Sequence, residues 1–300
     1  MLKTLLSMWR FSRPHTIYGT SVSILGLYLL AYNSSEMGGL ASLSTLAIAL
    51  VACLCANIYI VGLNQLYDIE IDRINKPHLP LASKALSWPQ GCWIVGLTGI
   101  LSVALSAVTN PYLLATVSIS SIIGTAYSLP PIRLKRFPFP ASLCIYTVRG
   151  LVVNIGLYLY FRSEQSLTPQ TSPELWALVG FVLVFTLAIA LFKDIPDMEG
   201  DRQFNVATIS ILLGAKQTFH LCLWLLTATY IAVTVAALQL FTLDARILGF
   251  GHAIAVALLW WYRSRLSSWS SDRMYGYYQL IWKLFYVEYL LFPVAYLATQ

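Results

Sequence analysis

The chain alternates between long apolar stretches and short polar ones. A helix needs about 20 predominantly apolar residues to cross the hydrocarbon core of a bilayer, and nine stretches of the sequence come near this length. We predict a membrane-spanning helix for each of them. The nine are Thr16–Tyr32, Ser44–Asn64, Pro89–Thr109, Tyr112–Leu129, Pro140–Phe161, Leu175–Phe192, Thr218–Leu240, Ile247–Tyr262 and Gln279–Ala298.

The composition supports a protein embedded in a membrane. Hydrophobic residues make up 58% of the 300 residues and charged residues only 11%, whereas a soluble domain carries about 25% charged residues. So few charges exclude a water-soluble globule, a disordered chain, a coiled coil and a secreted disulfide scaffold. We interpret the net charge of +6 as a property of loops at the membrane surface, not of a nucleic-acid-binding surface. The expected fold is one all-α integral membrane domain over residues 1–300, with nine helices in a bundle around a central cavity.

The basic residues predict how the helices are oriented. Fifteen of the 19 Lys and Arg residues lie in the N-terminal segment and in the loops after the second, fourth, sixth and eighth spans. The opposite loops hold only Arg162 and Arg246. By the positive-inside rule, the N-terminus is cytoplasmic. Because the 15 residues before the first span are too few for an organellar transit peptide, we expect a multi-pass protein of a bacterial membrane.

Two acidic clusters directly follow the second and sixth spans, on the face predicted to be cytoplasmic. Four spans separate them, and the segments Asp68–Asn75 and Asp197–Asn205 share a rhythm of acidic residues. We therefore expect a parallel internal repeat of two four-helix halves, followed by a ninth helix. The clusters consist of Asp68, Glu70 and Asp72, and of Asp194, Asp197, Glu199 and Asp201.

The spacing within each cluster predicts shared helix faces. Asn64, Asp68 and Asp72 are four residues apart, which places them on one face of a continuous helix. Asp197 and Asp201 have the same spacing, and we expect Pro196 to bend the chain between them and Asp194. Stacked carboxylates repel one another unless a cation lies between them.

Carboxylates at this density favour a hard cation. Mg²⁺ is typically held by one or two protein carboxylates together with the phosphate oxygens of a substrate, so two acidic faces fit Mg²⁺ ions that bind a diphosphate. The alternative is a pair of solvated loops in which the acids pair with nearby basic residues. The helices between the clusters suit a hydrocarbon tail, and a dry interior would protect a carbocation formed when the diphosphate leaves. The basic residues available to the diphosphate are Arg73, Lys135, Lys193 and Arg202, with Arg133 and Arg136 beside Lys135.

The two clusters also resemble those of a known family. The pattern N-x-x-x-D-x-x-x-D at Asn64–Asp72 and the pattern D-x-x-D-x-x-x-D at Asp194–Asp201 are similar to the two signatures of the UbiA superfamily of intramembrane aromatic prenyltransferases. The segment Tyr127–Arg136 resembles the part of that family that contributes to diphosphate binding. The resemblance covers nearly the whole chain and implies Mg²⁺-dependent transfer of a prenyl group from a prenyl diphosphate to an aromatic acceptor.

The resemblance assigns roles to single residues. It implies that Asp68, Asp72, Asp197 and Asp201 hold Mg²⁺, with Asp194 as a helper. Asn64 would orient the first metal site or a diphosphate oxygen. The leaving diphosphate would be bound by Arg73, Lys135, Lys193 and Arg202.

Four further segments resemble the cyanobacterial branch of the superfamily that prenylates homogentisate. This implies homogentisate as acceptor and phytyl diphosphate as donor, with loss of CO₂ and diphosphate, in a plasma or thylakoid membrane. Geranylgeranyl or solanesyl donors, and chlorophyll synthesis, remain alternatives. No protein partner is implied. The segments are Trp9–Thr16, Gly62–Asp68, Lys76–Ala82 and Phe192–Arg202.

Several polar residues lie inside or at the entrance of predicted spans. Arg149 and Glu288 fall near the middle of the fifth and ninth spans, where a charge is costly. They either serve substrate binding or neutralise each other or a neighbour. Arg13, with Arg10 and His15, is a candidate for the acceptor carboxylate or for anchoring at the interface. We expect structural roles for His78, His220 and His252.

A cation transporter is the alternative from another functional class, since some transporters also carry repeated acidic motifs. Transporters usually place their ion ligands near the midplane of the membrane, often in inverted repeats. Here the acidic clusters lie at span ends and the halves are predicted to be parallel, which favours the enzyme.

Overall fold

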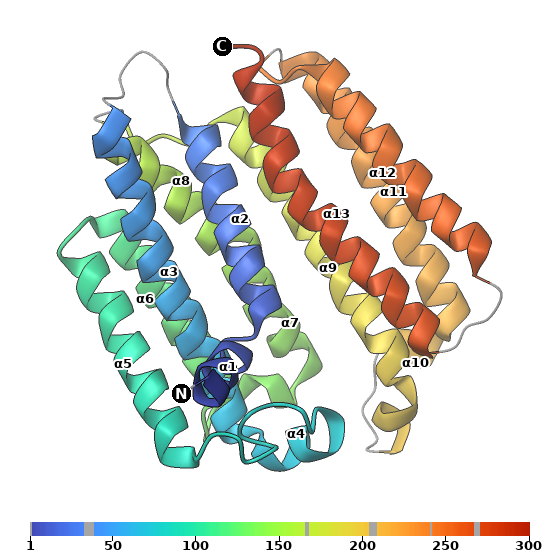
Figure 1. The fold of residues 1–300 in the computed structure, drawn as a ribbon. Coiled ribbons are helices and arrows are strands. Elements are labelled where there is room, and N and C mark those ends of the chain that lie inside the picture. Colours follow the sequence, from blue (N-terminus) through green and yellow to red (C-terminus); the bar gives the residue numbers. More distant parts are fainter. Residues whose placement is uncertain (1, 33–38, 166–167, 204–208, 241, 267–270) are drawn as a thin grey trace. The chain divides into compact units, whose positions relative to one another are not determined.

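In the computed structural model, the described residues are 2–32, 39–165, 168–203, 209–240, 242–266 and 271–300. Every regular element within these ranges is a helix (Figure 1). The elements are α1 (Leu2–Phe11), α2 (Pro14–Ala31), α3 (Gly39–Tyr67), α4 (Ile69–Asn75), α5 (Trp88–Ala107), α6 (Pro111–Ser128), η1 (Leu134–Arg136), α7 (Pro138–Tyr146), η2 (Thr147–Val152), α8 (Val153–Glu164), α9 (Pro173–Gln203), α10 (Ile209–Leu213), α11 (Ala215–Leu240), α12 (Ala245–Arg265) and α13 (Ser271–Leu297).

Among the described residues, seven helical segments are long and apolar enough to cross a membrane, which confirms an all-helical membrane protein. The two remaining predicted spans, Thr16–Tyr32 and Tyr112–Leu129, coincide with α2 and α6, which are helices of 18 residues outside that set. A total of nine spans therefore stays a prediction. The seven segments are Leu43–Tyr67, Trp88–Ala107, Phe139–Glu164, Pro173–Lys193, Ala215–Gln239, Ala245–Arg265 and Arg273–Leu297.

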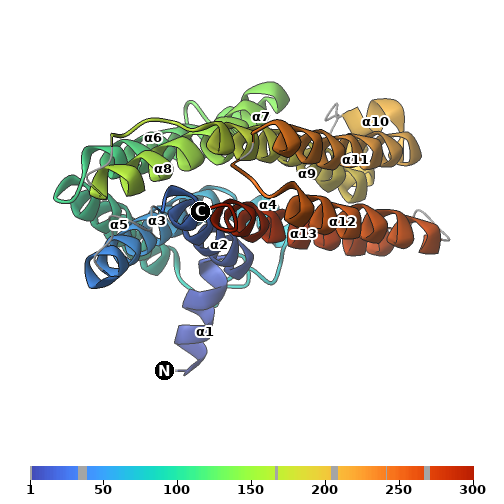
Figure 2. The ribbon, with the colours of Figure 1, turned by 90° about the horizontal axis from the view of Figure 1, so that it is seen from above.

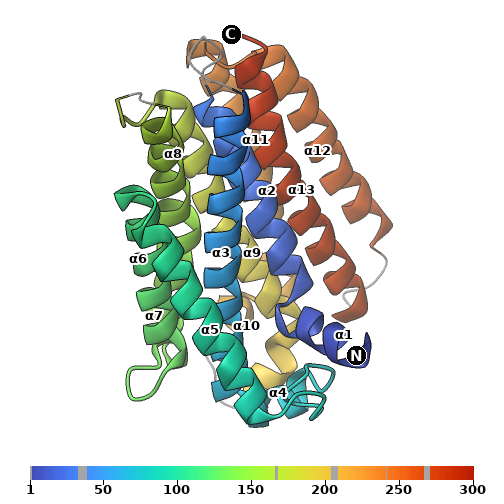
Figure 3. The ribbon, with the colours of Figure 1, turned by 60° about the vertical axis from the view of Figure 1, so that its left-hand side comes forward.

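The chain forms two compact units. The first comprises residues 1–144 and 155–170, and the second comprises residues 145–154 and 171–300. In the first unit, α3 packs against α2, α5 and α6, and α5 also packs against α6. Figure 3 shows α1 and α4 at the same end of α3. The chain therefore gathers its N-terminal segment and its first acidic cluster at one end of one helix.

The second unit is built around four long helices. Helix α9 packs against α11 and α13, and α12 packs against the same two helices. Seen from above in Figure 2, α9 and α11 form one row and α12 and α13 another. Aromatic side chains fill the space between them, with Phe185, Tyr277 and Phe292 all fully buried. The result is a rigid apolar frame for the second acidic cluster at the end of α9.

Helix starts follow the local sequence. Ser87 caps α5 in a reciprocal arrangement with Gln90, and Asn110 caps α6 ahead of Pro111. Such side chains satisfy backbone N–H groups that have no partner at a helix start, and proline in the first turn loses nothing there.

Gly62 lets the N-terminal segment lie directly on α3. A Cβ atom at Gly62 would come within 2.8 Å of the Phe11 ring and 2.7 Å of Val95, so a side chain cannot fit there. Beside it, the Gln65 amide donates to the Phe11 carbonyl over 2.7 Å. Phe11 is completely buried, and it packs with Leu63 and Val95 in one apolar cluster. These contacts fix the position at which Arg13 enters α2.

One local prediction is wrong, and two helices have features that it did not include. Helix α3 ends at Tyr67, and Asp68 is the residue that caps α4, with φ −117° and ψ 14°; Asn64, Asp68 and Asp72 are therefore not on one continuous helix. Helix α9 runs from Pro173 to Gln203, so Asp194 and Asp197 lie on one helix, and the bend expected at Pro196 stays a prediction. The predicted span Pro140–Phe161 contains a π-helical segment, η2.

Candidate active site

The first acidic cluster lies at the end of α3, and Asp68 is its centre. One carboxylate oxygen of Asp68, Oδ1, accepts from Nη2 of Arg133 over 2.9 Å, and the other, Oδ2, accepts from Nζ of Lys135. The three side chains are largely buried, with exposed fractions of 12–19%. An ion pair shielded from water in this way is stronger than a surface pair. Asp68 is therefore held between two cations.

Arg133 reaches Asp68 from a strained backbone. Its φ of 39° and ψ of 59° lie in the left-handed region, which disfavours side chains other than glycine by roughly 1–2 kcal/mol. The same Nη2 also donates to the Tyr67 carbonyl, over 3.2 Å, at the last residue of α3. Arg133 thus donates both to the last carbonyl of α3 and to the Asp68 carboxylate.

Asp72 lies one turn further along, and it is more deeply buried than Asp68. Its exposed fraction is 5%, and its Oδ2 atom is buried without a hydrogen-bond partner. Burial raises the pKa of Asp72, while Arg13 and Lys76 act in the opposite direction. A buried carboxylate oxygen without a donor is costly, and a cation ligated there would relieve that cost. The oxygens of Asp68 and Asp72 therefore fit the hard ligands that Mg²⁺ prefers.

Arg13 approaches the same end of α3 from the N-terminal side. It too has a left-handed backbone, with φ 52°, and its Nη2 donates to Oδ1 of Asn64 over 3.4 Å. The Asn64 amide in turn donates to Ser128 over 3.5 Å. Burial lowers the pKa of Arg13, whereas Asp72 and Asp68 raise it. The sequence-predicted residues Arg13, Asn64, Asp68, Asp72 and Lys135 are thus brought together.

Two other basic residues predicted near the diphosphate lie apart from this group. Arg73 pairs with Glu70 over 2.7 Å at an exposed position of α4, which is the solvated ion pair that we weighed as the alternative. Arg136 is exposed at the end of η1. Arg133, which the sequence placed only beside Lys135, makes the direct contact. Its signal was its position two residues before Lys135, on the first turn after the proline pair.

The second acidic cluster lies on the last turns of α9. Asp194, Asp197 and Asp201 occupy positions i, i+3 and i+7 of that helix, which share one side by register. Their side chains, and that of Arg202, lie outside the described residues. Lys193 is exposed, and Phe192 and Ile195 on either side of the Lys193–Asp194 pair are buried. Among the described side chains, no three of the types Asp, Glu, His and Cys gather closely enough to hold a metal.

Glu288 and Arg149 do not form the charge pair that we considered. Glu288 contacts Nε2 of His252 over 2.8 Å, and both side chains are 2% exposed. The guanidinium of Arg149 lies 4.7 Å from the ring centre of Trp282. No local sequence pattern pairs His252 with Glu288, because Glu288 lies 36 positions further along the chain, on another helix.

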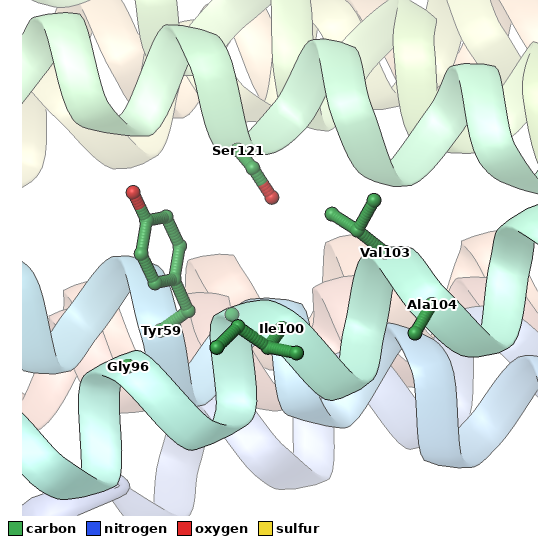
Figure 4. Close-up of a pocket in the computed structure, with 7 residues that line it drawn as sticks. Tyr59, Gly96, Ile100, Val103, Ala104 and Ser121 are labelled. Atoms are coloured by element: carbon green, nitrogen blue, oxygen red, sulfur yellow. The ribbon is translucent and has the colours of Figure 1, made fainter.

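A pocket of about 490 Å³ lies between α3, α5 and α6 (Figure 4). The Ser121 hydroxyl points into it, the Tyr59 ring lines one side with its hydroxyl bonded to Thr125, and the rest of its lining is apolar. Tyr59 lies five residues before Asn64, on nearly the opposite side of α3. The pocket is therefore separate from the aspartate site.

The described fold is all-helical and gathers carboxylates and cations at one end of α3, groups that suit Mg²⁺ and a diphosphate. Residues 21–284 match the UbiA prenyltransferase family, and the chain belongs to that family. The homogentisate phytyltransferase of Synechocystis sp. is 49% identical over 98% of this chain and 96% of its own length. The homogentisate geranylgeranyltransferase of Triticum aestivum is 38% identical over 97% of this chain and 72% of its own length.

Solved structures share the fold. A digeranylgeranylglyceryl phosphate synthase matches with a TM-score of 0.68 at 21% identity, over 99% of this chain and all of that one. A UbiA homologue from Archaeoglobus fulgidus, bound to GPP and Mg²⁺, matches with a TM-score of 0.64 at 16% identity, over 96% and 99% of the two chains. The resemblance predicted from the two aspartate motifs is confirmed, and the protein is a membrane prenyltransferase.

Proposed function

We propose that the protein transfers a phytyl group from phytyl diphosphate to homogentisate. CO₂ and diphosphate are released, and the product is 2-methyl-6-phytyl-1,4-benzoquinol, a precursor of tocopherols. The observation that carries the proposal is the 49% identity to a homogentisate phytyltransferase over nearly the full length of both chains. The charged cluster around Asp68 supports it, because that cluster supplies both metal ligands and diphosphate-binding cations.

The residues of the first unit have different roles in the proposed reaction. Asp68 and Asp72 hold Mg²⁺, whose charge weakens the bond between C1 of the phytyl chain and the diphosphate oxygen. Lys135 and Arg133, which pair with Asp68 in the structure, would supply cations to the diphosphate oxygens if Asp68 held the metal. Asn64, held by Arg13 and Ser128, orients this end of the site.

The residues of the second acidic motif complete the metal ligands, as the family resemblance implies. Asp194, Asp197 and Asp201 have this role in the proposal, and Lys193 and Arg202 bind the diphosphate with Arg73 as an outer contact. The electron-rich ring of homogentisate then attacks C1, and the apolar helices exclude the water that would otherwise capture the phytyl cation.

The topology is part of the same proposal. The chain crosses the membrane nine times as one domain over residues 1–300, as a parallel repeat of four-helix halves around a central cavity, with a ninth helix at the end. The N-terminus and both aspartate motifs face the cytoplasm of a bacterial, cyanobacterial cell. The asymmetry of basic loops supports this orientation.

The experiment is an assay of the purified protein in lipid nanodiscs. Homogentisate is supplied with phytyl, geranylgeranyl or solanesyl diphosphate, with Mg²⁺ or with EDTA, and products are identified by mass spectrometry. We expect the phytyl product, in the presence of Mg²⁺ only. Product from geranylgeranyl diphosphate alone would correct the donor. If no donor gives a product and the protein carries metal ions across liposome membranes, the transporter hypothesis would be favoured over the enzyme.

A further inference from the structure

We propose that Arg149 binds the carboxylate of a small aromatic acid, which under the proposed function is the acceptor homogentisate. The inference rests on that function for the identity of the ligand. It rests on the second unit alone for its geometry, since Arg149 and all the contacts used below belong to that unit.

Arg149 stands on a π-helical bulge inside an apolar span. The segment η2 (Thr147–Val152) interrupts the α-helix, and the amide of Asn154 donates to the carbonyls of Arg149 and Gly150 over 2.8 and 2.9 Å. The other side of that amide accepts from the Tyr289 hydroxyl over 2.8 Å. Bulges of this kind are frequent at functional sites because they redirect a side chain. Asn154 therefore fixes the bulge that carries Arg149.

Close packing against α9 holds the bulge in place. A Cβ atom at Gly150 would lie 2.2 Å from the Leu183 side chain, so only glycine allows this approach. Leu183 precedes Asp194 by 11 residues on α9, which is about 16 Å at 1.5 Å per residue. Arg149 therefore lies on the membrane side of the second aspartate motif. The acceptor must meet C1 of the prenyl chain on that side of the diphosphate.

The guanidinium of Arg149 lies against an aromatic ring. It lies 4.7 Å from the ring centre of Trp282. The ring centres of Tyr278 and Tyr286, one turn before and after Trp282, lie 6.2 and 5.6 Å from the Trp282 ring centre. Glu288, which follows Trp282 by six residues on the same helix, is already paired with His252. No described carboxylate forms a salt bridge with Arg149.

An unpaired guanidinium within a membrane span is costly and marks a functional site. Arginine binds carboxylates through two parallel hydrogen bonds, and the half-buried rings of Tyr278, Trp282 and Tyr286 offer faces and edges to a second aromatic ring. A ligand that combines a carboxylate with an aromatic ring satisfies both. The chemistry matches an aryl acid better than a lipid phosphate, which would remain at the membrane surface.

The test compares two ligands that differ in the carboxylate. Homogentisate and methylhydroquinone are titrated into the detergent-solubilised protein by calorimetry, in wild type, Arg149→Gln, Arg149→Lys and Lys283→Gln. Lys283 is the matched control, since it is the exposed neighbour of Trp282 on α13. We expect Arg149→Gln to weaken homogentisate binding by about 10- to 100-fold and to change methylhydroquinone binding less than twofold. Arg149→Lys should fall between, and Lys283→Gln should match wild type.

Three results would overturn the inference. They are an unchanged Kd for homogentisate in Arg149→Gln, equal weakening of both ligands, and no preference for homogentisate in wild type. The size-exclusion elution volume and the Tm identify a variant that fails to fold. If Arg149→Gln fails to fold, the homogentisate affinity of Arg149→Lys tests the inference instead. The two proposals fail separately. If the wild-type protein prefers homogentisate but transfers no phytyl group, the proposed function is wrong. If the wild-type protein transfers the phytyl group and Arg149→Gln binds homogentisate equally well, this inference is wrong.

Discussion

Arg133 donates to Asp68 over 2.9 Å from a backbone in the left-handed region. Strained residues cluster at sites where the surrounding structure requires them. Here the left-handed backbone of Arg133 places its guanidinium beside Asp68 at the end of α3. The pair thus links the loop after α6 to the first aspartate motif.

Removing the carboxylate at Asp68 or Asp72 should abolish phytyl transfer. We expect Asp68→Ala and Asp72→Asn each to lower kcat by about a thousandfold or more, since bound metal supplies several kcal/mol and each 1.4 kcal/mol is a factor of ten. Glu164→Gln is the control, because exposed Glu164 accepts from Asn110 at the end of α6 opposite to Ser128. Initial rates at saturating Mg²⁺ measure the effect. Near-normal rates in either aspartate variant would remove the metal assignment.

Lys135 should matter for the donor and not for the acceptor. Burial lowers the pKa of Lys135, and Asp68 raises it. Lys135→Gln removes one cation from the diphosphate, so we expect the KM for phytyl diphosphate to rise about tenfold, the loss of one charge-assisted hydrogen bond. The KM for homogentisate should stay within twofold. Lys84→Gln, an exposed lysine in the loop before α5, should leave both constants unchanged; a shift in it comparable to Lys135→Gln would indicate a general charge effect.

Gly62 and Gly96 form a matched pair for a stability test. Gly62→Ala places a Cβ atom 2.7 Å from Val95 and 2.8 Å from Phe11, whereas a Cβ atom at Gly96 meets nothing within 4 Å. Overpacking of this kind costs about 1–3 kcal/mol. We expect a lower Tm in detergent for Gly62→Ala and no loss for Gly96→Ala. Equal Tm values for the two variants would show that the N-terminal segment does not lie on α3.

The buried pair of His252 and Glu288 should stabilise the second unit. His252→Leu leaves the Glu288 carboxyl without its partner in a dry interior, at a cost of about 1–3 kcal/mol. The double variant with Glu288→Leu removes both polar groups and should recover much of that loss. Thermal unfolding in detergent gives the comparison. A double variant less stable than the sum of the two single changes would contradict a simple pair.

The stability of the protein should depend on pH through Asp244, which lies outside the membrane-spanning segments. It caps α12, and the hydrogen bond from the Arg246 side chain lowers its pKa to about 2. A lowered pKa in the folded state means that the stabilisation is present above the ordinary value of 3.8 and is lost as the pH falls toward 2. Asp244→Asn should therefore have a lower Tm than wild type at pH 5. The difference should disappear near pH 2; a constant difference would assign the effect to packing.

Much of the fold could be predicted because hydropathy and helix caps are local. Each of the nine apolar stretches coincides with helical segments, and the candidate residues Asp68, Asp72 and Lys135 lie together as expected. The break of the helix at Asp68 could not be predicted from local sequence, and Arg133, which contacts this point, lies 65 positions away in the chain. The partner of Glu288 was hidden for the same reason, since no local pattern joins residues on different helices. The π-helical bulge is held by Asn154, whose amide donates to the carbonyls of Arg149 and Gly150. The sequence alone does not show whether an asparagine in a span bonds to its own backbone or to another helix.

The two cations on Asp68 have a consequence for the resting enzyme. If Mg²⁺ and a diphosphate bind here as proposed, Asp68 would gain the metal while Arg133 and Lys135 would gain the diphosphate oxygens, so none of the three side chains would lose a charged partner. The resting ion pairs would form again when the diphosphate leaves, and no charged side chain would need to be hydrated in between.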